Sequence, residues 1–244
     1  MFNPCPRIQR VPIAGAGQGQ DAAWVIDDVL LEPQRLRQQA IDHRHRFEAA
    51  AYNAYPGLEW QMGGEVSSPL SEFFMLHVRG LLGARRTLSM YSRLSLATLQ
   101  PVQLRPLQRL CHRDRFGTTA GQGVAACVIY LFDAPALGGT SFYRPRRPLP
   151  EIDADVRRWN TLSDEAFTRE IGVAPAYLCA SNAHFELVRT IPAAWNRAVF
   201  YDGGQFHSSH ITEPSLLSAD PGTGRLTLNG FFITRQQLPG ALAR

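Results

Sequence analysis

A histidine and an aspartate, His112 and Asp114, stand two positions apart in this 244-residue chain. If their segment is extended, residues i and i+2 point to the same face. One imidazole and one carboxylate would then occupy adjacent positions around a metal ion. The H-x-D pattern is common by itself, and a surface turn is the alternative interpretation.

A second histidine, His207, follows an apolar segment and the turn Gly203–Gly204. Added to His112 and Asp114, it would complete a facial triad of two histidines and one carboxylate. Such a triad leaves coordination positions open and suits Fe(II) and O2, whereas structural zinc sites prefer a closed tetrahedron. His210 competes for the same role, although it would face differently in an extended segment.

An arginine at the start of the last apolar segment, Arg225, is a candidate for binding an anion. An inward-pointing guanidinium needs a negative partner, and a dicarboxylate held by its planar fork fits that need. Thr227 lies two residues further and would face the same side. Tyr130, within the apolar strand expected over 123–132, could add its phenol to the same carboxylate.

The order of these motifs resembles the 2-oxoglutarate- and Fe(II)-dependent dioxygenases, and within them the prolyl-hydroxylase-like branch. It runs H-x-D, a Y-L strand, G-G-T-x-F, a distal histidine and R-x-T. The resemblance covers about residues 94–232, and segment 25–37 is similar to the opening strand and helix of these proteins. The chain departs from the family's pattern in a longer segment, 213–224, between the distal histidine and the arginine.

The resemblance implies a role for each motif residue. Three residues would hold Fe(II): His112, Asp114 and His207. Three would bind the cosubstrate 2-oxoglutarate: Arg225, Tyr130 and Thr227. An aromatic residue, Phe231, would close the cosubstrate pocket, and a Gly138–Gly139 turn would let the chain pass close to it. The implied activity consumes O2, releases succinate and CO2, and hydroxylates a C–H bond of an amino acid, a peptide or another small molecule.

The elements that must position these residues are helices first and then many short strands. This order predicts a mainly β fold with flanking helices: a double-stranded β-helix (jelly-roll, cupin-like) core with the N-terminal helices on one sheet. We expect a single domain, 1–244, with an N-terminal strand and helices (1–85), the core (86–146 and 181–235) and an insertion (147–180). The insertion and segment 213–224 would be either a pocket wall or lid, or tolerated surface insertions.

Three local elements are also expected. A helix is predicted over 69–82 with Ser68 as its cap, and another over 163–171 with Ser163 as its cap. Segment 102–113 is predicted to hold a strand. Tyr52, Tyr55 and Trp60 would either line the entrance to a site or pack in the core.

Composition narrows the function. All 25 basic Lys and Arg residues are arginine, which excludes Schiff-base and P-loop lysine chemistry. The arginines are scattered among 21 acidic residues, so nucleic acid is not an expected partner. Apolar runs are too short to span a membrane, and the N-terminus lacks a secretory pattern. Four cysteines without a C-x-x-C pair fit a reducing cytoplasm.

Two other classes of function remain open at this point. One is a catalytically inactive β-helix that acts as a binding module. The other is a cupin-like enzyme that uses another divalent metal. A small molecule or a peptide is the expected partner, and neither the identity of the substrate nor the oligomeric state follows from the residues.

Overall fold

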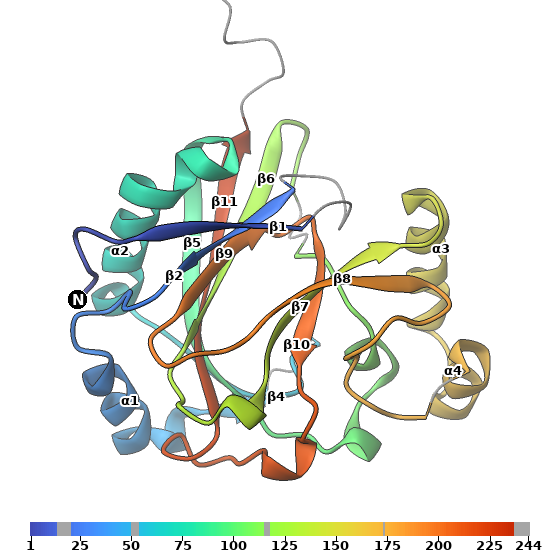
Figure 1. Cartoon of the computed structure of the whole chain (residues 1–244). Helices are drawn as coiled ribbons and strands as arrows, with labels where there is room; N and C mark the ends of the chain where they lie inside the picture. The colour runs from blue at the N-terminus through green and yellow to red at the C-terminus, as the bar shows by residue number, and fades with distance from the viewer. Residues whose placement is uncertain (14–20, 50–53, 115–117, 173, 237–244) are drawn as a thin grey trace, which may run out of the picture.

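Two antiparallel sheets face each other, and helices cover their outer faces (Figure 1). The computed structural model describes residues 1–13, 21–49, 54–114, 118–172 and 174–236. The larger sheet has eight strands, in the order β1 (Ile8–Pro12), β2 (Ala22–Ile26), β9 (Ala198–Asp202), β6 (Gln122–Tyr130), β11 (Arg225–Gln236), β5 (Ala84–Ala97), β4 (Gly57–Gln61) and β3 (Glu48–Ala49). The smaller sheet has three strands, in the order β10 (Phe206–His210), β7 (Gly139–Pro145) and β8 (Phe185–Ile191).

The chain passes repeatedly from one sheet to the other. It leaves β5 in the larger sheet, bridges to the smaller sheet at His112, and returns to β6. It then forms β7 and β8 in the smaller sheet, β9 in the larger, β10 in the smaller and β11 in the larger. This alternation between two facing antiparallel sheets is a double-stranded β-helix, and it confirms the predicted fold class.

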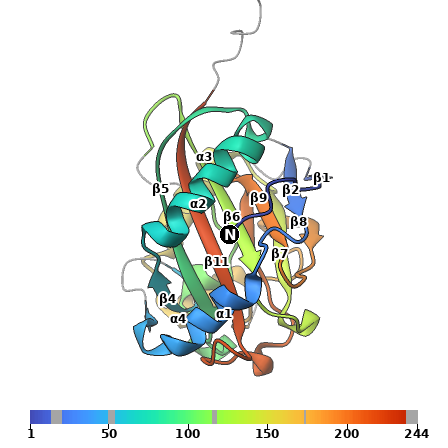
Figure 2. The ribbon, with the colours of Figure 1, turned by 90° about the vertical axis from the view of Figure 1, so that its left-hand side faces the viewer.

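Two helices cover the outer face of the larger sheet and bury its apolar side chains (Figure 2). Its buried side chains include Leu94, Leu96, Leu226, Leu228 and Phe232. Helix α1 (Pro33–Asp42) begins with a proline, which the first turn of a helix accommodates because its N–H groups have no partner within the helix. The helix buries Leu36 and Ala40. Helix α2 (Gly64–Phe73) buries Val66, Leu70 and Phe73. These residues form one core cluster with the sheet.

The helix predicted over 69–82 begins earlier than the sequence suggested. It starts at Gly64 with Gly63 as its N-cap, so Pro69 lies inside the helix and Ser68 is not the cap. The earlier start lets Val66 face the core together with Leu70. Beyond Phe73 the chain continues as a π-helical turn and a 3₁₀ turn to Leu82.

The outer face of the smaller sheet is covered by helix α3 (Leu149–Trp159) and helix α4 (Asp164–Ile171). Ser163 accepts a hydrogen bond from Ala166 N, which confirms the predicted cap of α4. Both helices fall within the segment predicted as an insertion. The proposed division of the chain into core and insertion stays a prediction.

The strand predicted over 102–113 is wrong. Two 3₁₀ turns, Pro101–Gln103 and Pro106–Arg109, occupy most of this segment. Each begins with a proline, which lacks the N–H that a strand ladder would need. His112 alone forms an isolated bridge to the smaller sheet.

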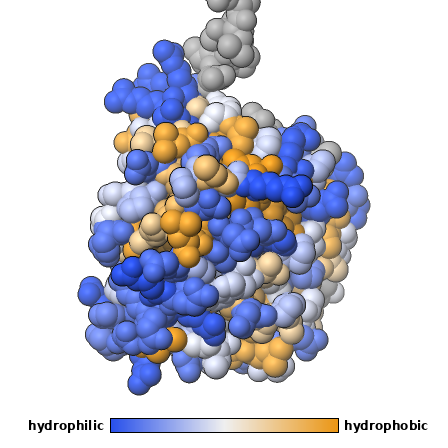
Figure 3. Space-filling view, turned by 60° about the vertical axis from the view of Figure 1, so that its left-hand side comes forward, coloured by the Kyte–Doolittle hydropathy of each residue, from blue (hydrophilic) through white to orange (hydrophobic). Residues whose placement is uncertain are grey.

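The surface over α1 and α2 is mixed, with apolar side chains in small groups between hydrophilic ones (Figure 3). Large exposed apolar residues of the chain include Leu31, Met75, Leu76 and Leu88. Among the described residues, no helix combines the length and the apolar character that crossing a membrane would require. The four cysteines are all free thiols in the structure.

Candidate metal centre and the adjoining cavity

Two of the predicted ligands, His112 and His207, are paired by backbone hydrogen bonds. His112 N donates to His207 O, and His207 N donates to His112 O, both at 2.9 Å. Residues paired in this way project their side chains to the same face of the ladder. The two imidazole rings accordingly lie with their centroids 4.4 Å apart.

The carbonyl group of Gln205 orients the imidazole of His207. His207 Nδ1 lies 3.0 Å from Gln205 O, so Nδ1 carries the proton and Nε2 remains available to a metal. Burial lowers the pKa of His207 to about 4. The ring is therefore neutral near pH 7, which is the form that binds metal ions.

The ring of His112 is more open than that of His207. Its side chain is 58% exposed, because it borders a cavity rather than packing into the core. Removal from bulk water and the neighbouring His207 still lower its pKa. Both imidazoles are therefore neutral bases at neutral pH.

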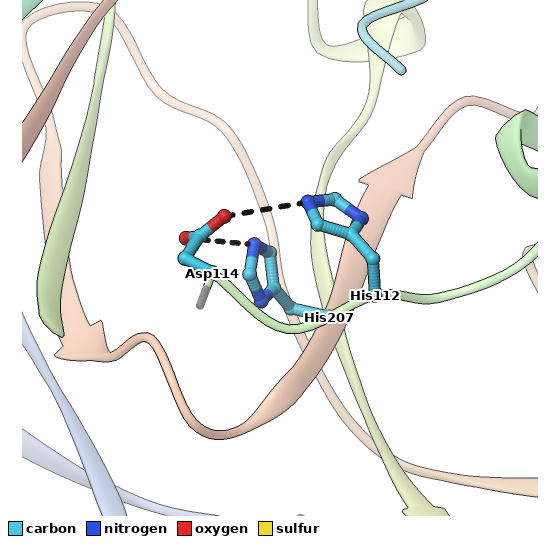
Figure 4. Close-up of side chains that lie close together, drawn as sticks. All are labelled: His112, Asp114 and His207. Carbon is cyan, nitrogen blue, oxygen red and sulfur yellow. Dashed lines mark ion pairs between the residues drawn. The ribbon is translucent and has the colours of Figure 1, made fainter. Parts of the chain in front are cut away.

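Asp114 lies just beyond the bridge, where the backbone of Gly203 comes close. Asp114 N donates to Gly203 O at 2.7 Å. A Cβ at Gly203 would come within 2.9 Å of Asp114 Cβ, so a side chain there would displace the aspartate. Asp114 Oδ1 lies 3.6 Å from His112 Nε2, and Oδ2 lies 3.4 Å from His207 Nε2 (Figure 4).

The three side chains fit a divalent cation. Their candidate ligand atoms all lie within 4.8 Å of one another. Asp114 Oδ2 is buried and makes no hydrogen bond to any described residue, despite the 3.4 Å approach of His207. Burial raises the pKa of Asp114, while electrostatic attraction from His112 and Arg93 opposes that shift. A cation would supply the positive partner that this carboxylate lacks.

A cavity of about 1080 Å³ adjoins the three side chains, between the two sheets. The aromatic residues that line it include, among those the structure describes, Tyr55, Trp60, Tyr91, Tyr177, Tyr201 and Phe231. Polar residues of the larger sheet line it as well: Glu59, Arg93, Arg225, Thr227 and Asn229. Among the described residues, α3 and α4 contribute none to this lining, and they pack behind the smaller sheet instead. Two residues later in the segment predicted as an insertion, Tyr177 and Leu178, do line the cavity.

Arg225 is buried in the wall of the cavity, where two backbone carbonyls hold its guanidinium. Its Nε donates to Leu137 O at 3.0 Å and its Nη2 donates to Gly139 O at 2.8 Å. Gly138 has a φ of 84°, and a Cβ there would come within 1.6 Å of His210 O. The tight turn that presents these two carbonyls therefore requires glycine at position 138, the turn that the G-G-T-x-F motif predicted.

Thr227 and Tyr130 lie near Arg225 in different ways. Thr227 lines the cavity, and its Oγ1 accepts a hydrogen bond from Asn229 Nδ2 at 3.1 Å. Tyr130 is fully buried and is not among the lining residues. Its hydroxyl lies 2.7 Å from Thr140 Oγ1, and Thr140 does line the cavity. Sequence reasoning singled out Tyr130 and overlooked Thr140, although Thr140 is the threonine of the G-G-T-x-F motif.

The inner face of the larger sheet carries rows of polar side chains. One row runs across β4, β5, β11 and β6 through the paired residues Glu59, Ser95, Thr227 and Tyr130. The next row contains Gln61, Arg93 and Asn229. Sequence reasoning did not find Glu59 or Arg93. Alternation along 84–97 reveals two faces, but it does not reveal that the polar face borders a cavity.

The remaining candidates lie as follows. His210 Nδ1 is 2.8 Å from Ser141 Oγ, and His210 is outside the group of three possible ligands. Tyr55 and Trp60 line the cavity, whereas Tyr52 lies outside the described residues. The roles predicted for His112, Asp114, His207, Arg225, Tyr130 and Thr227 stay predictions.

The strand order and the central two-histidine, one-aspartate cluster define a double-stranded β-helix protein with a candidate metal centre. At the level of the fold, this confirms the resemblance to the 2-oxoglutarate- and Fe(II)-dependent dioxygenases. The chain belongs to the family described as DUF6445, a family of unknown function, whose model matches residues 4–232. No curated protein matches the sequence.

Solved structures that resemble this chain include three bacterial proteins. A prolyl-4-hydroxylase of Pseudomonas putida is 16% identical over 88% of this chain and 93% of its own, with a TM-score of 0.43. AviO1 of Streptomyces viridochromogenes is 18% identical over 93% of both chains, with a TM-score of 0.40. HygX of Streptomyces hygroscopicus, solved with nickel and 2-oxoglutarate, is 12% identical over 86% of this chain and 82% of its own, with a TM-score of 0.42.

Proposed function

We propose that this protein is an Fe(II)- and 2-oxoglutarate-dependent oxygenase that hydroxylates a C–H bond of a small molecule, an amino acid or a peptide. The observation that carries the proposal is the convergence of His112, Asp114 and His207 at the cavity wall. Two neutral imidazoles and one carboxylate are the donor set of oxygenases that leave coordination positions open for a cosubstrate and O2. HygX, solved with nickel and 2-oxoglutarate, is similar in outline.

The residues of the chain divide the work between binding and orientation. Gln205 holds the His207 ring with Nε2 toward Asp114, so the ligand atoms are aligned before a metal arrives. We expect the guanidinium of Arg225, which is buried and lines the cavity, to bind the distal carboxylate of 2-oxoglutarate; the hydroxyl groups of Thr227 and Thr140 line the same cavity. When bound, iron supplies the O2 activation that couples conversion of 2-oxoglutarate into succinate and CO2 to hydroxylation of the substrate.

The aromatic and apolar walls serve a second purpose. Tyr201 and Phe142 pack around the ring of His207, with centroids 4.6 and 6.3 Å away. A site that excludes water strengthens the attraction between a bound dicarboxylate and Arg225. It also protects reactive species from side reactions.

The test begins with metal and cosubstrate. Anaerobic addition of Fe(II) and then 2-oxoglutarate should give a visible charge-transfer band, because the keto acid would chelate the iron. Succinate formation should then be measured against a library of amino acids, peptides and other small molecules. A protein that binds neither Fe(II) nor 2-oxoglutarate would be a binding module, and turnover that requires another divalent metal but no 2-oxoglutarate would indicate the cupin-like alternative.

A further inference from the structure

A second guanidinium faces the cavity, and the proposed chemistry does not use it. Arg93 lies in the middle of β5, in the row that it shares with Gln61 and Asn229. Its guanidinium lies over the ring of Phe231, and the row of Phe231 continues across the sheet through Ala126 to Tyr201. Tyr201 packs against the ring of His207 at 4.6 Å, so Arg93 lies on the side of the cavity near the candidate metal. Arg225, by contrast, is tied to the Gly138–Gly139 turn.

The side chain of Arg93 is held in one orientation. Its Nε lies 2.8 Å from Glu59 Oε1 on the neighbouring strand. Its guanidinium lies over the ring of Phe231 at 4.8 Å and over the ring of Tyr55 at 5.9 Å. An arginine that is already fixed by a carboxylate and by aromatic rings loses little further conformational entropy when it binds an anion.

The Nη edge of this guanidinium has no hydrogen-bond partner among the described residues. Within the described part of the chain, the ion pair that Arg93 forms is with Glu59, through Nε. The two side chains are only 15% and 6% exposed, and burying an ion pair costs more than burying an apolar pair of similar size. A buried pair that borders a large cavity is therefore explained better by a ligand than by stability.

The other arginines of the cavity wall have different partners. Arg113 pairs with Asp153 of α3. Arg46 lies over the ring of Trp60, on the short segment before β3. Arg93 is thus the guanidinium that offers a planar donor edge beside the candidate metal, and a planar donor edge matches the two oxygens of a carboxylate.

We propose that the substrate carries a carboxylate that binds bidentately to the Nη edge of Arg93, with Glu59 holding the guanidinium in place. This proposal rests on the proposed oxygenase function, because it places the carboxylate beside the same metal centre. It narrows the substrate class to carboxylic acids, such as free amino acids or the carboxyl end of a peptide. The C–H bond that reacts would then lie within a few bonds of that carboxylate.

The experiment compares carboxylic acids with their primary amides, which have the same shape without the charge. The probes are the common amino acids and benzoate, each paired with its amide, added to the anaerobic Fe(II) protein saturated with 2-oxoglutarate. Perturbation of the charge-transfer band gives a dissociation constant for each probe. We expect at least one acid to bind about tenfold more tightly than its amide.

The substitution Arg93→Gln should reduce that preference to within about twofold and leave the affinity for 2-oxoglutarate unchanged. Arg46→Gln, which removes a cation elsewhere on the cavity wall, should retain the preference. If Arg93→Gln does not fold because Glu59 loses its ion pair with Arg93, the double variant Arg93→Gln/Glu59→Gln replaces both charges by amides and serves the same purpose.

Three results would overturn the proposal: no acid preferred over its amide, a preference that survives the loss of Arg93, or an equal loss of 2-oxoglutarate affinity in the variant. The last result would make Arg93 a contact of the cosubstrate. A wild-type protein that gives no charge-transfer band would contradict the oxygenase function itself. Calorimetric titration of the same pairs into the two proteins would then decide the carboxylate site separately.

Discussion

The two sheets of the β-helix differ in what they bring to the cavity. The smaller sheet brings His207 and, through its backbone, His112, and Asp114 follows directly. The larger sheet lines the cavity with hydroxyl, amide and guanidinium groups, among them those of Arg225, Thr227 and Arg93. The candidate metal ligands and the candidate anion-binding groups thus lie on opposite walls.

The helices behind the two sheets differ as well. Helices α1 and α2 pack against the larger sheet through a broad apolar cluster. Helices α3 and α4 pack against residues that alternate with the candidate ligands: Cys111 beside His112, and Phe206 beside His207. We therefore expect changes behind the larger sheet to affect mainly stability, and changes behind the smaller sheet to affect the position of the candidate ligands.

The largest expected effect is at the smaller sheet. His207→Ala should lower iron binding and succinate formation at least about a hundredfold, since even outer contacts of metal ligands are worth tenfold to a hundredfold. The measurement is bound iron and turnover in the folded protein. His210→Ala is the matched control on the same strand, and it should stay within about twofold of the wild type. The reverse pattern would move the third ligand to His210.

A deletion behind the larger sheet should affect stability instead. Phe232 is fully buried and stacks on Phe74 at a centroid distance of 3.9 Å. Phe232→Ala should lower the free energy of unfolding by about 3–5 kcal/mol, measured by denaturant titration, with iron binding of the folded fraction unchanged. Leu88→Ala, at an exposed position of β5, should change it by about 0.5 kcal/mol or less. Loss of iron binding in Phe232→Ala would show that packing behind the larger sheet also affects the metal site, and would contradict the expected difference between the two sheets.

A milder change on the larger sheet should lower only the affinity for the cosubstrate. Arg225→Lys keeps the charge but loses the planar fork. The apparent affinity for 2-oxoglutarate should fall about tenfold or more, as expected for a lost hydrogen bond to a charged group, while iron binding persists. Arg189→Lys on β8 is the control. An unchanged affinity in Arg225→Lys would remove Arg225 from the cosubstrate site.

The smallest effect should arise behind the smaller sheet. Arg113 lies between two candidate ligands and pairs with Asp153 of α3. Asp153→Asn should weaken metal binding by up to about tenfold. Asp155→Asn alters the same helix at a residue that pairs with Arg147 and Arg158, so it should leave metal affinity as it is. Equal affinities in the two variants would limit α3 to a purely structural role.

The sequence predicted the fold class and brought out three residues that the structure places together, because order along the chain and alternation are local signals. It missed β4, β8 and α3, and it placed a strand where Pro101 and Pro106 impose 3₁₀ turns. The bridge at His112 was not predictable in the same way. It depends on a partner more than ninety residues away along the chain.

The same physical reason explains why Arg93 and Glu59 escaped notice. Their side chains meet because β4 and β5 pair in one particular register. That register is fixed by long-range pairing, since a shift by one residue would reverse the faces. No pattern within either strand reports on a cavity that forms only when the two sheets close.

The reciprocal backbone bonds between His112 and His207 have a consequence for assembly. Because backbone hydrogen bonds bring these two residues together, we expect the chain to fold without a metal ion. Small zinc domains behave otherwise, since there the ion drives folding. Here a chelator should yield a folded apoprotein, and added Fe(II) should raise its melting temperature only in proportion to the logarithm of its concentration over its dissociation constant.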